Sequence, residues 1–326
     1  MLRKQLLLFL AIAGLFLVLD VQTGWAQRRD PLRPATIKQF SGRRMLFVWS
    51  NWFRDGNDIL SYPERRQTLL DFCSRKEIEI IFLNSEGVVY GDQEDLKNFR
   101  RFIREAHRRG MLVFGLQGNH WWSVPAGSRV EGQTNNSENG WHYVKKVVQF
   151  GMFDGIIDDT EPYLANTDDW WTRTEQRAQW YVDWLKGVRR IVGNQMPFGA
   201  TIPFWYDQDG RVANLRLEGS NDLRPLNRYV SDIVDVVNIM DYRDFSDGPD
   251  GLIFHAQGEM AYGPAIIGVE TQCLGEGRIA DKQSFCEEGE AAMEAALSEV
   301  YAVYGTDPHF KGFSIHFYES YRDLPP

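Results

Sequence analysis

The sequence has few of the residues that build several common kinds of site. It holds only three cysteines and six histidines, and the histidines lack the close spacing of a zinc motif. No Gly-x-Ser-x-Gly segment occurs, so a serine hydrolase has no support. Positive charge is in deficit, with a net charge of −9, which argues against nucleic acid or an anionic membrane as a partner. We expect no cofactor.

The N-terminus carries an apolar run from Leu6 to Leu19 behind a short basic start. Small residues up to Ala26 then stand where a signal peptidase requires them. The run is short for a membrane span, and polar residues follow it. We predict a signal peptide over residues 1–26, an N-terminal extension over 27–43, and a secreted or periplasmic protein without an integral membrane segment.

The cysteines allow two interpretations. Cys273 and Cys286 flank one glycine-rich loop, and exported proteins commonly form disulfides. The sequence leaves open whether these two are joined, since three cysteines carry little information. Cys73 falls in a helical pattern and is expected to be buried.

The rest of the chain alternates between apolar runs and amphipathic segments. Eight runs are expected as strands: 45–50, 78–84, 111–117, the acidic stretch from 153, 198–205, 234–242, 265–270 and 312–318. The helices expected between them cover 63–75, 93–109, 140–150, 169–193, 223–233, 253–261 and 289–304. The runs are continuously apolar, as in strands buried on both faces. The pattern predicts an α/β fold, a single-domain (β/α)8 TIM barrel over residues 44–326. A doubly wound sheet is the alternative, but no glycine-rich phosphate loop follows the first strand.

A barrel of this kind places its active site at the carboxyl ends of its strands. The residues expected there are Trp49, Asn51, Asn84, Gln117, His120, Asp159, Glu161, Trp205, Asp241, Tyr242, Arg243, Glu270 and His316. The pairs 121–122 and 170–171, all tryptophan, are further candidates for sugar platforms. Acids and amides bind hydroxyl groups, and aromatic faces cover the C–H surface of a sugar ring. The set predicts a carbohydrate-binding cleft.

The fourth strand carries three acids near its end. Side chains alternate along a strand, so Asp159 and Glu161 share one face with Ile157, while Asp158 lies on the other. Two neighbouring acids suit a proton donor and a group that tunes its pKa. A solvated loop that caps the next helix is the plainer alternative.

The stretch from Asp154 to Glu161 resembles the fourth-strand motif D-G-x-D-x-D-x-E of the family 18 glycoside hydrolases, the chitinase-like barrels. Asp154, Gly155, Asp159 and Glu161 match its first, second, sixth and eighth places. The resemblance implies that Glu161 is the general acid and that Asp159 orients an acetamido group. Residues 240–242, Met-Asp-Tyr, are similar to the family's sixth-strand M-x-Y, which implies that the tyrosine supports the reacting sugar.

The sequence departs from this family at two positions. Ile157 stands in place of the middle acid of the motif, and His316 stands in place of a tryptophan. These differences leave a mechanism specific for N-acetyl sugars in doubt. The missing acid also favours an alternative function, a carbohydrate-binding pseudoenzyme without hydrolytic activity.

A second resemblance concerns the same glutamate. Residues 160–162, Thr-Glu-Pro, are similar to the Asn-Glu-Pro of the large clan of retaining barrel glycosidases. That resemblance implies a nucleophile at the end of the seventh strand, where this chain has Glu270. Both resemblances assign the proton-donor role to Glu161, and they differ on whether Asp159 or Glu270 is its partner.

The working hypothesis is an exported glycoside hydrolase acting on a poly- or oligosaccharide, with Tyr242 and Arg243 positioning the sugar. A plain ion pair between Arg243 and Glu270 is an alternative role for both. A weaker hypothesis is a metal-dependent hydrolase that uses Asp158, Asp159 and His120.

Overall fold

The computed structural model describes residues 43–49, 58–275, 277 and 281–326. The predicted signal peptide, almost all of the predicted extension, and Asn51 lie outside the described residues. Among the described residues, no helix is long and apolar enough to span a membrane.

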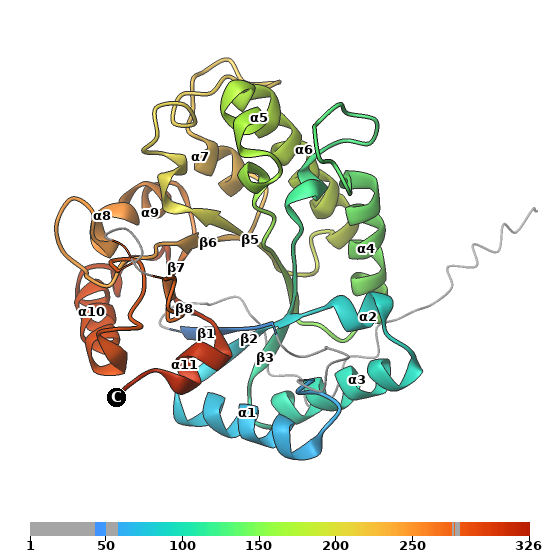
Figure 1. Cartoon of the computed structure of the whole chain (residues 1–326), viewed down its shortest axis with the longest axis vertical. Helices are drawn as coiled ribbons and strands as arrows, with labels where there is room; N and C mark the ends of the chain where they lie inside the picture. The colour runs from blue at the N-terminus through green and yellow to red at the C-terminus, as the bar shows by residue number, and fades with distance from the viewer. Residues whose placement is uncertain (1–42, 50–57, 276, 278–280) are drawn as a thin grey trace, which may run out of the picture.

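Eight parallel strands close into a barrel in chain order, and β8 pairs with β1 (Figure 1). The strands are β1 Arg43–Val48, β2 Ile78–Asn84, β3 Leu112–Gln117, β4 Gly155–Asp158, β5 Phe198–Pro203, β6 Val236–Met240, β7 Ala265–Glu270 and β8 Phe310–His316. The predicted TIM barrel is therefore confirmed.

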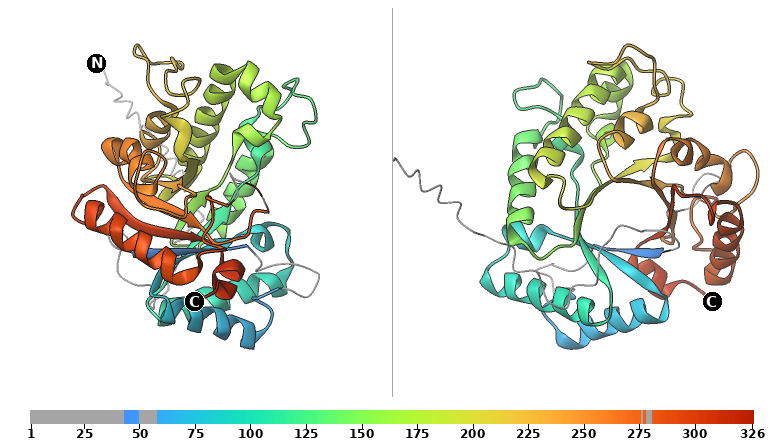
Figure 2. Two further views of the ribbon diagram at one scale, coloured as in Figure 1. Left: turned by 60° about the vertical axis from the view of Figure 1, so that its left-hand side comes forward. Right: turned by 180° about the vertical axis from the view of Figure 1, so that it is seen from behind.

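Helices surround the barrel on its outside (Figures 1 and 2). They are α1 Pro63–Arg75, α2 Glu86–Tyr90, α3 Gln93–Arg108, α4 Ser137–Phe150, α5 Thr167–Thr172, α6 Thr174–Val192, α7 Leu226–Ser231, α8 Leu252–His255, α9 Gln257–Tyr262, α10 Gly289–Tyr304 and α11 Tyr318–Asp323. Three short 3-10 helices are η1 His120–Ser123, η2 Pro162–Leu164 and η3 Phe204–Tyr206. The sequence did not predict α2 or α11.

Three predicted helices differ from the structure. The helix expected over 169–193 is broken at Arg173, whose φ of −127° and ψ of 38° are not helical. The helix expected over 223–233 begins only after Pro225, because Arg224 pairs with Leu215 in an isolated β-bridge. The helix expected over 253–261 is two short helices that meet at Ala256.

The core has an inner and an outer layer. An inner cluster, which includes Phe47, Phe82, Phe114 and Ile157, fills the barrel. The larger cluster, which includes Ile156, packs the strands against the helices. The two isoleucines of β4 thus face opposite layers, which confirms the predicted alternation and fixes the direction of the acids that follow.

Candidate active site

Asp158, the last residue of β4, points away from the barrel interior. Its carboxylate accepts hydrogen bonds from Trp184 Nε1 at 3.1 Å and from Thr160 Oγ1 at 3.2 Å, and it is fully buried. Burial raises the pKa of Asp158 to about 7, against the opposing effect of these donors. Asp158 therefore belongs to the packing between β4 and α6.

Asp159 and Glu161 lie together on the other face. Asp159 Oδ1 is buried and has no hydrogen-bond partner among the described residues. Burial, followed by the charges of Glu161 and Asp158, raises the pKa of Asp159 well above its usual value. Burial also raises the pKa of Glu161, while the Tyr163 hydroxyl, which donates to Glu161 Oε1, lowers it. The surroundings of Asp159 and Glu161 therefore favour the protonated forms of these carboxyl groups.

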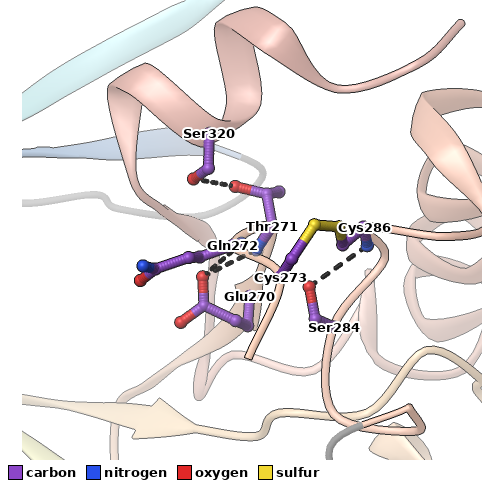
Figure 3. The surroundings of a disulfide bond; sticks show 7 residues. All are labelled: Glu270, Thr271, Gln272, Cys273, Ser284, Cys286 and Ser320. Atoms are coloured by element: carbon purple, nitrogen blue, oxygen red, sulfur yellow. Dashed lines mark hydrogen bonds between the residues drawn. A yellow bond between two sulfur atoms is a disulfide. The ribbon is translucent and has the colours of Figure 1, made fainter. Parts of the chain in front are cut away.

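Glu270, at the end of β7, has the opposite surroundings. Its Oε1 accepts the backbone N–H groups of Thr271 at 2.8 Å and Gln272 at 2.7 Å (Figure 3). Its Oε2 lies 2.7 Å from His316 Nδ1. An ionised glutamate can only accept hydrogen bonds, and the three N–H donors around this buried carboxylate suit that form.

The tautomer of His316 follows from its partners. Trp49 Nε1 lies 2.9 Å from His316 Nε2, and an indole N–H can only donate. Nε2 must therefore be the acceptor, and the ring proton sits on Nδ1, from which it is donated to Glu270. Trp49, His316 and Glu270 form one directed hydrogen-bond chain across β1, β8 and β7.

Tyr242 lies close enough to both sets of carboxyl groups to be affected by their charges. Its ring stacks on His316 with a centroid distance of 6.1 Å and an interplanar angle of 29°. Burial raises the pKa of the Tyr242 hydroxyl, and the charges of Glu270, Asp159 and Glu161 raise it further, in that order. The structure thus brings six predicted residues together at the carboxyl end of the barrel: Trp49, Asp159, Glu161, Tyr242, Glu270 and His316.

Two predicted residues after β6 face elsewhere. Asp241 is fully buried and contacts His255 of α8, with Oδ1 2.9 Å from Nδ1. The Arg243 guanidinium binds Asp250 at 2.6 and 3.0 Å and lies over the Phe204 ring. The ion pair between Arg243 and Glu270 is wrong, since Asp250 is the partner of Arg243.

The remaining predicted residues line the other strand ends. Asn84 is buried and donates to the Trp49 carbonyl at 3.3 Å. Gln117 is buried in register with Asp158 on the β3–β4 ladder. His120, in η1, lies against Trp121, and burial lowers the His120 pKa.

The proposed tryptophan platforms are mostly core. Trp122 and Trp170 are buried, and only Trp171 of the second pair keeps a partly exposed side chain. Sequence reasoning missed Tyr163, whose hydroxyl donates a hydrogen bond to Glu161. The sequence did contain one indication of this contact. Tyr163 lies only two residues after Glu161, so its side chain can reach the same strand end.

The disulfide between Cys273 and Cys286 is present and joins two segments that both hold Glu270 (Figure 3). Gln272, before the first cysteine, binds the side chain, and Phe285, before the second, donates its N–H to the Glu270 carbonyl at 3.0 Å. The same loop carries Lys282, which pairs with Asp250, the carboxylate that also binds Arg243.

No group of three acidic, histidine or cysteine side chains within the described ranges is arranged as metal ligands. Asp158 and Asp159 point to opposite faces of β4, so they cannot share an ion with His120. The metal-dependent hypothesis has no structural support.

Comparison with known proteins bears on the fold. No family model matches the sequence, and no curated protein matches it significantly. A chitinase from Rhizomucor miehei superposes with a TM-score of 0.50 at 14% identity, covering 85% of this chain and 95% of that chain. The exo-β-1,4-mannosidase Op5Man5 from Opitutaceae bacterium strain TAV5 gives 0.55 at 12%, covering 89% and 55%. A β-glucuronidase from Bacteroides uniformis gives 0.51 at 11%, covering 86% and 30%.

The chain therefore shares its barrel fold with chitinases and other glycosidases, and it spans only part of the mannosidase and glucuronidase chains. The predicted chitinase-like resemblance is confirmed for the fold. At these identities the chemistry has to come from the site itself.

Proposed function

We propose that this protein is an exported glycoside hydrolase, with Glu161 as general acid and Glu270 as the anion that stabilises positive charge on the sugar. The single observation that carries the proposal is the contrast between these two glutamates. Burial raises the pKa of Glu161, while Glu270 accepts three N–H donors. Glycosidases use one protonated and one ionised carboxyl, set apart by their surroundings.

Asp159 then acts through Glu161. Its carboxyl lies on the same face, and a charge on Glu161 makes loss of the Asp159 proton costlier. The pair retains a proton near neutral pH, which a general acid requires. Tyr242, near all three carboxyl groups, is suited to position the reacting sugar.

A carbohydrate-binding protein without turnover is the second candidate. Ile157 favours it, because this side chain fills the barrel interior where the resembled motif has an acid. The difference matters only if the missing acid is needed for the reaction.

A panel of chitin-, glucan-, mannan- and peptidoglycan-type polymers tests the proposal with purified protein and the Glu161→Gln variant. Sugar release by the wild type that is lost in the variant supports the hydrolase. Binding without release by either protein supports the second candidate. The anomer of the first product then distinguishes the two mechanisms, since retention needs carboxyl groups about 5 Å apart and inversion about 6.5–9.5 Å.

A further inference from the structure

Three partly exposed aromatic side chains form a continuous row beside Glu161. Tyr163 lies edge-on to Trp205 with ring centroids 5.2 Å apart, and Trp205 lies against Trp171 at 5.6 Å. All three pack on the outer core yet keep some exposure. We call Tyr163, Trp205 and Trp171 the aromatic row.

The row comes from three different segments. Tyr163 is in η2 after β4, Trp205 is in η3 after β5, and Trp171 is in α5. Buried Trp170 supports the row from behind, at 6.4 Å from Tyr163 and edge-on to Trp171 at 6.1 Å. The exposed Arg211 guanidinium lies 3.5 Å from the Trp171 ring centroid, at the far end of the row. Local packing thus fixes the rings in place.

The row is joined to the proton donor by one hydrogen bond. The Tyr163 hydroxyl donates to Glu161 Oε1, so Glu161 Oε2 is left to carry and deliver the proton. A general acid in a glycosidase protonates the oxygen of the departing sugar. A group that touches this acid therefore lies next to the departing part of the substrate.

We propose that the aromatic row is the binding site for the departing sugar, so that the substrate continues past the cleaved bond as at least one further pyranose. Aromatic rings suit this ligand, because the C–H face of a pyranose packs on them without loss of its equatorial hydrogen bonds. Describing this sugar as the departing one rests on the proposed function. The binding of a sugar by the row does not.

The test uses immobilised chito-, cello- and mannotetraose with the full-length mature protein carrying Glu161→Gln, so that no ligand is consumed. Trp205→Ala is added to this background, with Trp205→Phe as the conservative variant. Tyr262→Ala is the matched control, since Tyr262 is an aromatic of α9 that is 39% exposed and outside the row. Circular dichroism and thermal melts verify that each variant is folded.

Trp205→Ala is expected to weaken binding at least 10-fold, Trp205→Phe to recover most of it, and Tyr262→Ala to change it less than twofold. Unchanged binding in folded Trp205→Ala, or no binding of any oligosaccharide by the parent protein, would overturn the site. If binding follows this pattern while the wild type releases no sugar, sugar binding by the aromatic row is supported and the proposed hydrolase activity is refuted.

A second measurement, in an active enzyme, tests on which side of the cleaved bond the aromatic row binds sugar. The ratio of kcat/KM for a tetrasaccharide to that for the glycosyl fluoride of the same sugar reports on the departing side, because fluoride fills no sugar site. Trp205→Ala should lower this ratio about 10-fold. An unchanged ratio with weakened binding would place the row on the other side of the cleaved bond.

Discussion

The ends of β4 and β7 carry the same chemical group in opposite surroundings. Glu161 has one hydroxyl donor and an acidic neighbour, while Glu270 has two backbone donors and an imidazole. One end therefore favours a bound proton, and the other favours a charge. The difference shows that the role of a carboxyl group in this barrel is set by the donors that its loop supplies.

The largest effects are expected from Glu161→Gln and Glu270→Gln, measured in parallel. Glu161→Gln should lower kcat on an oligosaccharide by about 10²- to 10⁴-fold but affect a glycosyl fluoride far less, because fluoride needs no proton donor. Glu270→Gln should depress hydrolysis of both substrates, since it removes the charge itself. Steady-state kinetics on both substrates measure this, and equal losses for Glu161→Gln would contradict its role as acid.

The imidazole of His316 offers a smaller test of the β7 end. His316→Phe keeps a ring against Tyr242 but removes the donor to Glu270, and a hydrogen bond to a charged group contributes about 1.5–3 kcal/mol. We expect kcat to fall about 10- to 100-fold. Trp49→Phe, which removes only the N–H donated to Nε2, should have the weaker effect. A kcat unchanged by His316→Phe would separate the imidazole from the reaction.

Asp158 extends the comparison to the outer face of β4. Its pKa is raised to about 7, so the folded protein binds a proton that the unfolded chain releases near pH 4. Stability therefore falls as the pH rises from about 4 to 7, by up to roughly 4 kcal/mol from this group. Asp158→Asn should remove that part of the fall. Urea unfolding at pH 5 and pH 8 measures it, and equal pH dependence in both proteins would count against the assignment.

The smallest expected effect concerns the hydroxyl of Tyr163. This donor lowers the pKa of Glu161, so Tyr163→Phe should raise the pKa of Glu161. The other titratable groups near Glu161, which are Asp159, His316 and Tyr242, are unchanged by this substitution. The acid then stays protonated to higher pH, so the basic limb of the kcat/KM profile should move to higher pH.

Tyr206→Phe is the matched control for that shift. The Tyr206 hydroxyl is buried and makes no hydrogen bond to another described residue, so its loss should leave the limb in place. Movement of the limb in both variants would indicate a general loss of packing around η2 and η3.

The sequence predicted the barrel well because burial on both faces gives each strand an uninterrupted apolar run. It also placed Glu161, Tyr242, Glu270 and His316 at strand ends that meet in space. It failed at Arg243 and Asp241, since polar residues after β6 turn to either side and their partners, Asp250 and His255, come from a loop and a helix of their own. Helix ends were missed where tertiary contacts compete, as at Arg173 and Pro225.

The fixation of the β6–β7 side has a consequence for engineering. There the disulfide, the Lys282–Asp250–Arg243 ion pairs and the backbone bond from Phe285 to Glu270 cross-link neighbouring loops. The aromatic row after β4 and β5 is held by ring packing, by the hydrogen bond from Tyr163 to Glu161 and by the Arg211 guanidinium over Trp171. A mutant library confined to the aromatic row could therefore be selected for binding of new sugars, while the cross-linked loops of the β6–β7 side keep their structure.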